Sequence, residues 1–146
     1  MVADRDIALN LRAGKERIAS CGCGGLKVTL RGEPADVYVC SCQDCQRRSG
    51  GAFTYAAIFP EPNVTVTGEY RSWRRNGEAG RWIENSFCPD CGVAVFFHSE
   101  AMPGLIGIPV GCLSESEFPR PARHYWSSRK HHWLELPADI LLIDTQ

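Results

Sequence analysis

Seven of the eight cysteines in this 146-residue chain fall into three tight clusters. The clusters are Cys21-Gly22-Cys23, the run that holds Cys40, Cys42 and Cys45, and the pair Cys88 and Cys91. A disulfide between cysteines only two residues apart would be badly strained. Clustered cysteines at such spacings are typical of metal ligands. Redox-active pairs and unligated buried thiols are the alternatives that the spacing leaves open.

The first residues favour a reducing compartment. Residues 1–6 carry mixed charge, and neither the apolar segment nor the small-residue cleavage site of a secretory signal follows them. No stretch approaches the ~18 apolar residues that a membrane helix needs. We therefore expect a cytoplasmic location, where thiols stay reduced, and no membrane partner.

The spacing within each cluster suits zinc. Residues i and i+2 of a strand point to the same face, so a C-x-C motif at a strand end presents two sulfurs side by side. The C-x-x-C-G motif does the same in a tight turn, where glycine accepts a positive φ. Thiolates favour zinc over magnesium or calcium, and iron is the alternative metal.

Seven clustered cysteines exceed one four-thiolate site by three. Three protein ligands with an open fourth position are characteristic of catalytic zinc. Spacing alone does not decide which cluster is left over. The simplest partition gives one metal to Cys21, Cys23, Cys88 and Cys91 and another to Cys40, Cys42 and Cys45. Because three ligands bind more weakly than four, we expect the second zinc to be the more easily lost.

Short strands are expected to position these clusters. Apolar patterns predict strands at 26–30, 36–40, 53–59, 64–66, 70–73, 81–87, 93–97, 105–113 and 123–127. Residues 43–49 predict one or two helical turns that stop at Gly50-Gly51, and Gly68-Glu69 predicts a hairpin between 64–66 and 70–73. Strands at this spacing, among 14 glycines and 9 prolines, indicate a single all-β sandwich or barrel-like domain.

The charge balance argues against a nucleic-acid partner. Sixteen Lys and Arg against seventeen Asp and Glu give a net charge of −1, which provides no global attraction for nucleic acid. Four arginines (71, 74, 75 and 81) make one locally basic segment, but Glu69, Glu78 and Glu84 dilute it. The hydrophobic content of 44% is ordinary for a globular protein. The oligomeric state is left open.

The cysteine motifs, taken together, resemble a known family. C-G-C-G at 21–24, C-S-C-Q-D-C-Q-R-R-S-G-G-A-F at 40–53 and F-C-P-D-C-G at 87–92 are similar to motifs of the glutathione-dependent formaldehyde-activating (GFA) enzymes, a family that includes the domain shared with centromere protein V. Segments 107–115 and 121–126 resemble the family as well. The resemblance implies a mainly β fold, a β-tent of packed antiparallel sheets stapled by a four-cysteine zinc site.

The extent of the resemblance suggests how the chain is divided. It covers residues 16–134, which would form a GFA-type zinc-binding domain. Residues 1–15 would then be an N-terminal extension, and residues 135–146 a C-terminal tail that packs on the domain.

The resemblance also implies an activity. It assigns a structural zinc to Cys21, Cys23, Cys88 and Cys91, and a catalytic zinc to Cys40, Cys42 and Cys45. The reaction ascribed to the family adds glutathione to formaldehyde to give S-hydroxymethylglutathione, which is a carbon–sulfur lyase reaction run in reverse. We therefore expect a zinc-dependent lyase that acts on a small thiol such as glutathione and a small aldehyde. A non-catalytic zinc-binding interaction module is the alternative.

Three further residues are candidate substrate contacts. Arg47 follows the middle cluster and could bind a substrate carboxylate, although an exposed arginine needs no function. Gly51 could let a substrate approach the backbone or could simply end a turn. His124, in the family-like segment, could act as a general acid or serve a structural role.

Cys112 and Phe53 are expected to have structural roles. The apolar stretch around Cys112 predicts a buried, inert thiol. Its alternative role is that of a fourth ligand, which would close the three-cysteine site. Phe53 is expected in the core and not in the wall of a pocket.

Overall fold

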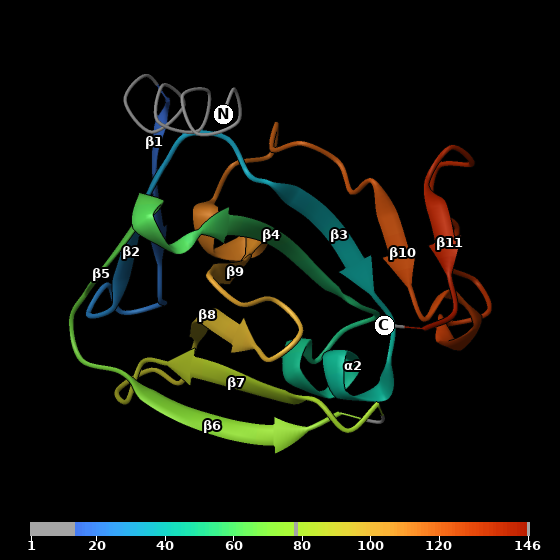
Figure 1. Ribbon diagram of the computed structural model, residues 1–146, viewed down its shortest axis with the longest axis horizontal. Helices are drawn as coiled ribbons and strands as arrows, with labels where there is room; N and C mark the ends of the chain where they lie inside the picture. The colour runs from blue at the N-terminus through green and yellow to red at the C-terminus, as the bar shows by residue number, and fades with distance from the viewer. Residues whose placement is uncertain (1–13, 78, 146) are drawn as a thin grey trace.

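Short strands dominate the computed structural model, which describes residues 14–77 and 79–145 (Figure 1). In β1 (Glu16–Ser20), Arg17 and Ala19 face inward. In β2 (Lys27–Arg31), Val28 and Leu30 do the same. This period of two is typical of a half-buried strand, and the two strands pair as an antiparallel hairpin.

The strands form two sheets. The smaller has the order β1-β2-β5, where β5 covers Val64–Thr67, and the larger has the order β11-β10-β3-β4-β9-β8-β7-β6. The strands of the larger sheet are β3 (Asp36–Cys40), β4 (Thr54–Pro60), β6 (Arg71–Asn76), β7 (Trp82–Phe87), β8 (Ala94–Ser99), β9 (Leu105–Pro109), β10 (Arg123–Tyr125) and β11 (Leu141–Ile143). The expected mainly β fold of packed sheets is thereby confirmed.

A short helix, α2 (Gln43–Ser49), follows β3 and ends at Gly50, whose φ of 66° is left-handed. Figure 1 shows α2 inside the curve of the large sheet, near the hairpin of β6 and β7. The Arg75 guanidinium of β6 lies 3.0 Å from the Asp44 carboxylate of α2. The described residues also include the 3-10 helices η1 (Glu61–Asn63), η2 (Val110–Leu113) and η3 (Ser127–Arg129).

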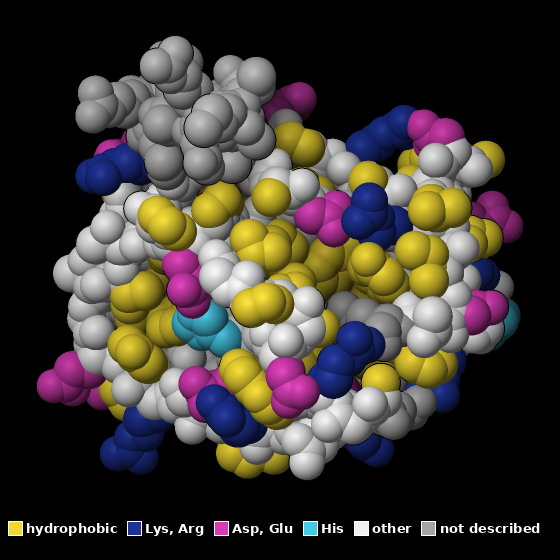
Figure 2. All heavy atoms as spheres, viewed as in Figure 1, with side chains coloured by type: hydrophobic (Ala, Val, Ile, Leu, Met, Phe, Trp, Pro, Cys, Tyr) yellow, Lys and Arg dark blue, Asp and Glu magenta, His cyan; other side chains and the backbone are white. Residues whose placement is uncertain are grey.

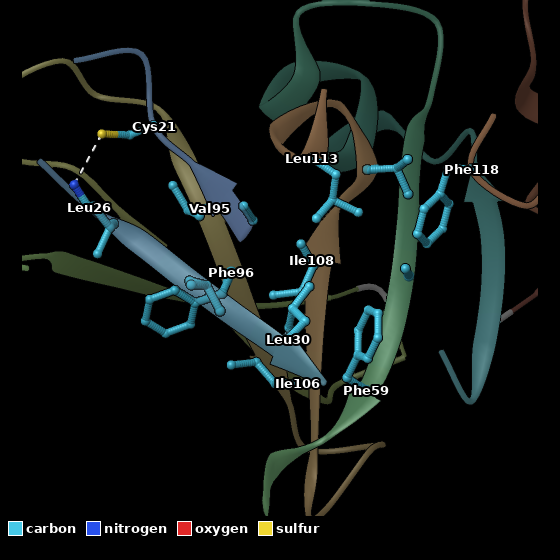
Figure 3. Close-up of a cluster of buried hydrophobic side chains, with 14 of the residues drawn as sticks. Cys21, Leu26, Leu30, Phe59, Val95, Phe96, Ile106, Ile108, Leu113 and Phe118 are labelled. Carbon is cyan, nitrogen blue, oxygen red and sulfur yellow. Dashed lines mark hydrogen bonds between the residues drawn. The ribbon is translucent and has the colours of Figure 1, made fainter. Parts of the chain in front are cut away.

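The buried side chains form two clusters. The larger lies where the small sheet packs on the large one, and it includes Leu30 of β2, Phe59 of β4 and Ile108 of β9 (Figure 3). Cys21 and Cys88 belong to this cluster. The smaller cluster holds Tyr38, Cys40, Ala56, Ile58 and Phe97, with Cys42 and Cys45 packed against it. Each cysteine group is therefore set against its own apolar cluster.

The expected hairpin between 64–66 and 70–73 is wrong. β5 pairs with β2 in the small sheet, whereas β6 pairs with β7 in the large one. The chain crosses between the sheets at Gly68, where φ is 104° and a Cβ would lie 2.0 Å from the Gly25 carbonyl oxygen. Pairing with β2 sets Val66 opposite Val28, beside the larger core. That long-range burial outweighs the local turn signal.

Two expected strands end earlier than their apolar patterns. β9 ends at Pro109, and residues 110–113 form η2. β10 ends at Tyr125, because Trp126 takes a left-handed φ of 53°. The pairings of β10 with β3 and with β11 are parallel, so the large sheet is not antiparallel throughout.

The structure describes only part of the two ends of the chain. Residues 1–13 of the expected N-terminal extension are not among the described residues. Within the expected tail, residues 135–146, β11 is the edge strand of the large sheet. Of the helices that are described, none combines the length and the apolar character needed to cross a bilayer.

Candidate functional site

The seven clustered cysteines come together as two groups. The sulfurs of Cys21, Cys23, Cys88 and Cys91 all lie within 4.8 Å of one another, and those of Cys40, Cys42 and Cys45 form a second such group. The structure thus groups the seven cysteines in the same way as the simplest partition between two metals that the sequence suggests. The first group joins the end of β1 in the small sheet to the end of β7 in the large sheet.

The four-cysteine group has dimensions that suit zinc. The Cys23 sulfur lies 3.7 Å from that of Cys21 and 3.6 Å from that of Cys88. Four sulfurs at the usual Zn–S distance of ≈ 2.3 Å would be about 3.8 Å apart along each edge of the tetrahedron. The donor set therefore fits a tetrahedral zinc ion.

Backbone N–H groups favour negative charge at this group. Figure 3 shows the Cys21 sulfur directed toward the backbone N–H of Leu26, which donates to it at 3.2 Å. Desolvation raises the pKa of Cys21, but the Leu26 N–H and the other three thiols outweigh it and lower that pKa to about 6. A thiol that ionises readily is prepared for metal binding.

The three-cysteine group forms where β3 passes into α2. Cys40 is the last residue of β3 and is fully buried. Cys42 caps α2, and its sulfur accepts a hydrogen bond from the Cys45 N–H at 3.4 Å. Cys45 lies in the first turn of the helix. A strand end and a helix start thus direct three sulfurs to one point.

One thiol of this group ionises more easily than the others. Contacts with the sulfurs of Cys40 and Cys45 lower the pKa of Cys42, and the positive charge of Arg75 contributes in the same direction. The contact with Cys42 in turn raises the pKa of Cys40. Cys42 is therefore the sulfur of this group that first carries negative charge.

The three-cysteine group has an open side. Cys42 and Cys45 line a cavity with about 80 Å³ available to the centres of water molecules. Burial raises the pKa of Tyr38, another lining residue, so its hydroxyl stays protonated. Figure 2 shows apolar side chains gathered in the middle of one face, with acidic and basic side chains around them. The remaining lining residues are Asp44, Arg75, Gly77, Ala79, Arg81, Ile83, Phe97, Ser99, Ala101, Met102 and Trp126.

His124 lies behind the cysteines and not on their open side. Its side chain is only 1% exposed, and its Nε2 lies 2.7 Å from Oγ of Ser41, the residue between Cys40 and Cys42. Burial lowers the pKa of His124, with a contribution from Lys130. Its Nδ1 has no hydrogen-bond partner within the described part of the chain. The structure thus connects His124 to the site through Ser41.

Arg47, in α2, and Gly51, just after it, do not line the cavity beside Cys42 and Cys45. Arg47 is 72% exposed and lies 3.8 Å from the Asp44 carboxylate. It lines a second hollow, which meets the first at Asp44 and Arg75. Gly51 is exposed, and its N–H donates to Ser49 Oγ at 3.1 Å. Phe53 also lines the second hollow, so the expectation that it belongs to the core is wrong.

Cys112 is remote from the three-cysteine group. Its sulfur donates to the carbonyl oxygen of Ala94 at 3.4 Å. It packs against the larger core cluster, whereas Cys40, Cys42 and Cys45 belong to the smaller one. The alternative role of Cys112 as a fourth ligand is therefore wrong, and its half-buried position is closer to the structural thiol expected.

Sequence reasoning missed the walls of the cavity. Asp44 and Arg75 form an ion pair there, and Ile83, Phe97 and Met102 supply apolar surface. Asp44 lies within the middle cysteine motif, but the other four residues belong to no recognisable motif. Those four come from β6, β7, β8 and the loop after β8, which lie far from Cys42 in the sequence and reach it only through the topology of the large sheet.

The comparisons with known proteins are consistent with this arrangement of cysteines. Residues 16–129 match the family of glutathione-dependent formaldehyde-activating enzymes, and this range contains all seven clustered cysteines. The chain belongs to this family.

Two similar proteins illustrate the relationship. A putative glutathione-dependent formaldehyde-activating enzyme of Penicillium rubens is 30% identical over 84 residues. That match covers 58% of this chain and 44% of the relative, so the chain spans less than half of that protein. The crystal structure of a Rhodobacter sphaeroides protein is similar in fold, with a TM-score of 0.53 and 22% identity over 71% of this chain and 91% of that one.

Proposed function

We infer that this protein forms or cleaves a thiol–aldehyde adduct at the three-cysteine group, as a carbon–sulfur lyase of the glutathione-dependent formaldehyde-activating type. The observation that carries this proposal is the open side of the group, where Cys42 and Cys45 line a cavity. Family membership supports glutathione as the thiol and formaldehyde or another small aldehyde as its partner. Such a reaction suits the cytoplasm, where glutathione and reduced thiols coexist.

The proposal includes two zinc ions. Cys21, Cys23, Cys88 and Cys91 fit a structural zinc, since four thiolates close its coordination. Cys40, Cys42 and Cys45 offer three donors and would hold a catalytic, more easily lost zinc. That ion would supply the positive charge that keeps a substrate thiol ionised near neutral pH.

The chemical step is an addition. The sulfur of an ionised thiol bonds to the carbonyl carbon of the aldehyde, the π electrons of the C=O bond move to oxygen, and that oxygen takes a proton. The reverse reaction breaks the same C–S bond. A free thiol of pKa ≈ 8.5 is only a few per cent ionised at pH 7, so raising that fraction is a direct route to acceleration.

The chain's own residues would orient the reactants. Arg47, on the second hollow, is exposed and can bind a substrate carboxylate. Gly51 is exposed and has no side chain of its own, which leaves the backbone after α2 open to approach. His124 would act as a positioning residue, because its hydrogen bond to Ser41 holds the backbone between Cys40 and Cys42.

The test compares Cys42→Ser with Cys112→Ser. We expect the wild-type chain and Cys112→Ser to bind two zinc ions and to accelerate adduct formation from glutathione and formaldehyde. Cys42→Ser should keep its fold and one zinc but lose at least about tenfold in rate, because only the three-cysteine group is damaged. Zinc content and the rate above the uncatalysed addition are the readouts.

Two results would count against the proposal. An unchanged rate in Cys42→Ser would place the reaction elsewhere. Two bound zinc ions without acceleration would favour the alternative, a non-catalytic zinc-binding interaction module.

A further inference from the structure

The cavity beside Cys42 and Cys45 is larger and more apolar than a one-carbon aldehyde requires. Its volume for the centres of water molecules, about 80 Å³, is several times the roughly 10–15 Å³ that one of them needs. Formaldehyde has two heavy atoms and would displace only a few. The remaining water would then lie against apolar walls, which is an unfavourable arrangement.

The apolar wall is built from several elements. Ile83 comes from β7, Phe97 from β8, Met102 from the loop after β8, and Trp126 from the residue after β10. All four belong to or pack against the smaller core cluster, together with Cys42 and Cys45. Phe97 is held by the Arg48 guanidinium, which lies 4.7 Å from its ring centroid. Sulfur ligands and apolar side chains therefore share one cavity.

The charged lining residues do not contradict an apolar ligand. Asp44 and Arg75 neutralise one another at 3.0 Å. Arg81 has no ion pair among the described residues, but it is exposed to solvent. The polar part of a thiol such as glutathione has a separate place, because Arg47 and Arg48 line the adjoining hollow.

We propose that this cavity binds the apolar carbon chain of the aldehyde-derived group, so that the preferred adducts come from aliphatic aldehydes of about four to six carbons and not from formaldehyde. The assignment rests on the proposed function, and it names the substrate class of the same site. Each methylene that enters an apolar pocket strengthens binding by roughly fourfold.

A binding series tests this independently of turnover. The zinc-loaded protein is titrated calorimetrically with ethanethiol, butanethiol and hexanethiol. We expect hexanethiol to bind at least tenfold more tightly than ethanethiol. In Met102→Gln this gain of hexanethiol over ethanethiol should shrink at least threefold, because Met102 is part of the apolar wall. Leu141→Gln is the matched control, since Leu141 is 60% exposed on the edge strand β11 and should keep the full gain.

Several outcomes would overturn the inference. They are equal affinities for the three alkanethiols, no binding of any of the three, or an equal reduction of the gain from ethanethiol to hexanethiol in Met102→Gln and Leu141→Gln.

Rates of catalysis with different aldehydes distinguish a failure of this inference from a failure of the proposed function. Rates with glutathione and formaldehyde, butanal or hexanal should rise with chain length, and a maximum at formaldehyde would overturn the inference. If no aldehyde is accelerated, the proposed function fails, while the alkanethiol affinities still decide the inference.

Discussion

The eight cysteines are chemically identical, but they lie in three different environments. Cys21 receives a backbone hydrogen bond at the junction of the two sheets. Cys42 faces a cavity, and contacts with two other sulfurs lower its pKa. Cys112 packs against the core, where burial raises its pKa. Reactivity follows the thiolate fraction and access, so the environment of Cys42 is compatible with the chemistry that we propose for its group.

His124 gives a prediction about pH. Burial lowers its pKa, so folding favours the neutral imidazole. Its contribution to stability is complete above the unfolded value of about 6.5 and is lost as the pH falls through the lower folded pKa. His124→Gln should be less stable by about 1–3 kcal/mol at pH 7, because Ser41 loses its hydrogen bond to the buried imidazole. The difference in the free energy of unfolding between this variant and the wild type should narrow at pH 5.

Urea unfolding of both proteins at the two pH values measures this difference. A gap of the same size at pH 7 and pH 5 would mean that the buried imidazole is not the group that titrates.

At the scale of elements, the site depends on how β8 and β9 pair. Phe97 of β8 lies opposite Gly107 of β9. A Cβ on Gly107 would lie 2.1 Å from Cζ of Phe97, so the aromatic ring occupies the space that the missing side chain leaves. Because Phe97 also lines the cavity, a glycine in a neighbouring strand determines the position of a wall of the site.

Gly107→Ala should therefore displace the Phe97 ring. We expect a loss of about 1–3 kcal/mol in the free energy of unfolding, which is typical of an overpacked core. Gly111→Ala is the matched control, because a Cβ at Gly111 meets nothing within 4 Å. Denaturant unfolding of the two variants provides the measurement, and equal stabilities would show that the ring moves aside at no cost.

For the whole molecule, a metal bound by the four-cysteine group would be a cross-link between the sheets. Cys21 and Cys23 follow β1 of the small sheet, while Cys88 and Cys91 follow β7 of the large one. A metal bound there would therefore stabilise the packing of one sheet on the other. Two of the three arginines of β6 are neutralised, because Arg74 pairs with Glu84 at 3.1 Å and Arg75 with Asp44 at 3.0 Å.

Cys88→Ser should accordingly destabilise the whole domain. With zinc supplied, we expect a loss of at least about 3 kcal/mol, or roughly 10 °C in Tm for a chain of this size. Cys42→Ser should change Tm far less, since its group lies within the large sheet and α2. Scanning calorimetry of the two variants measures both values, and similar Tm losses would contradict a special role for the cross-link.

Local patterns predicted much of the fold. The strands at 26–30, 36–40 and 53–59 and the helix at 43–49 lie within about one residue of β2, β3, β4 and α2. Their apolar runs, and the glycine that ends α2, are properties of neighbouring residues, so a single sequence carries the information. The hairpin at Gly68-Glu69 failed because the partner of β5 lies more than thirty residues away, in β2.

The sequence by itself determined which residues can bind metal, because cysteine spacing within a strand end or a tight turn brings sulfurs together locally. Only the tertiary structure decided what surrounds them. The cavity walls at Ile83, Phe97 and Met102, the Asp44–Arg75 ion pair and the distance of Cys112 from the three-cysteine group all depend on contacts between distant segments. Such contacts arise when sheets pack to bury apolar surface, and no local pattern specifies their register.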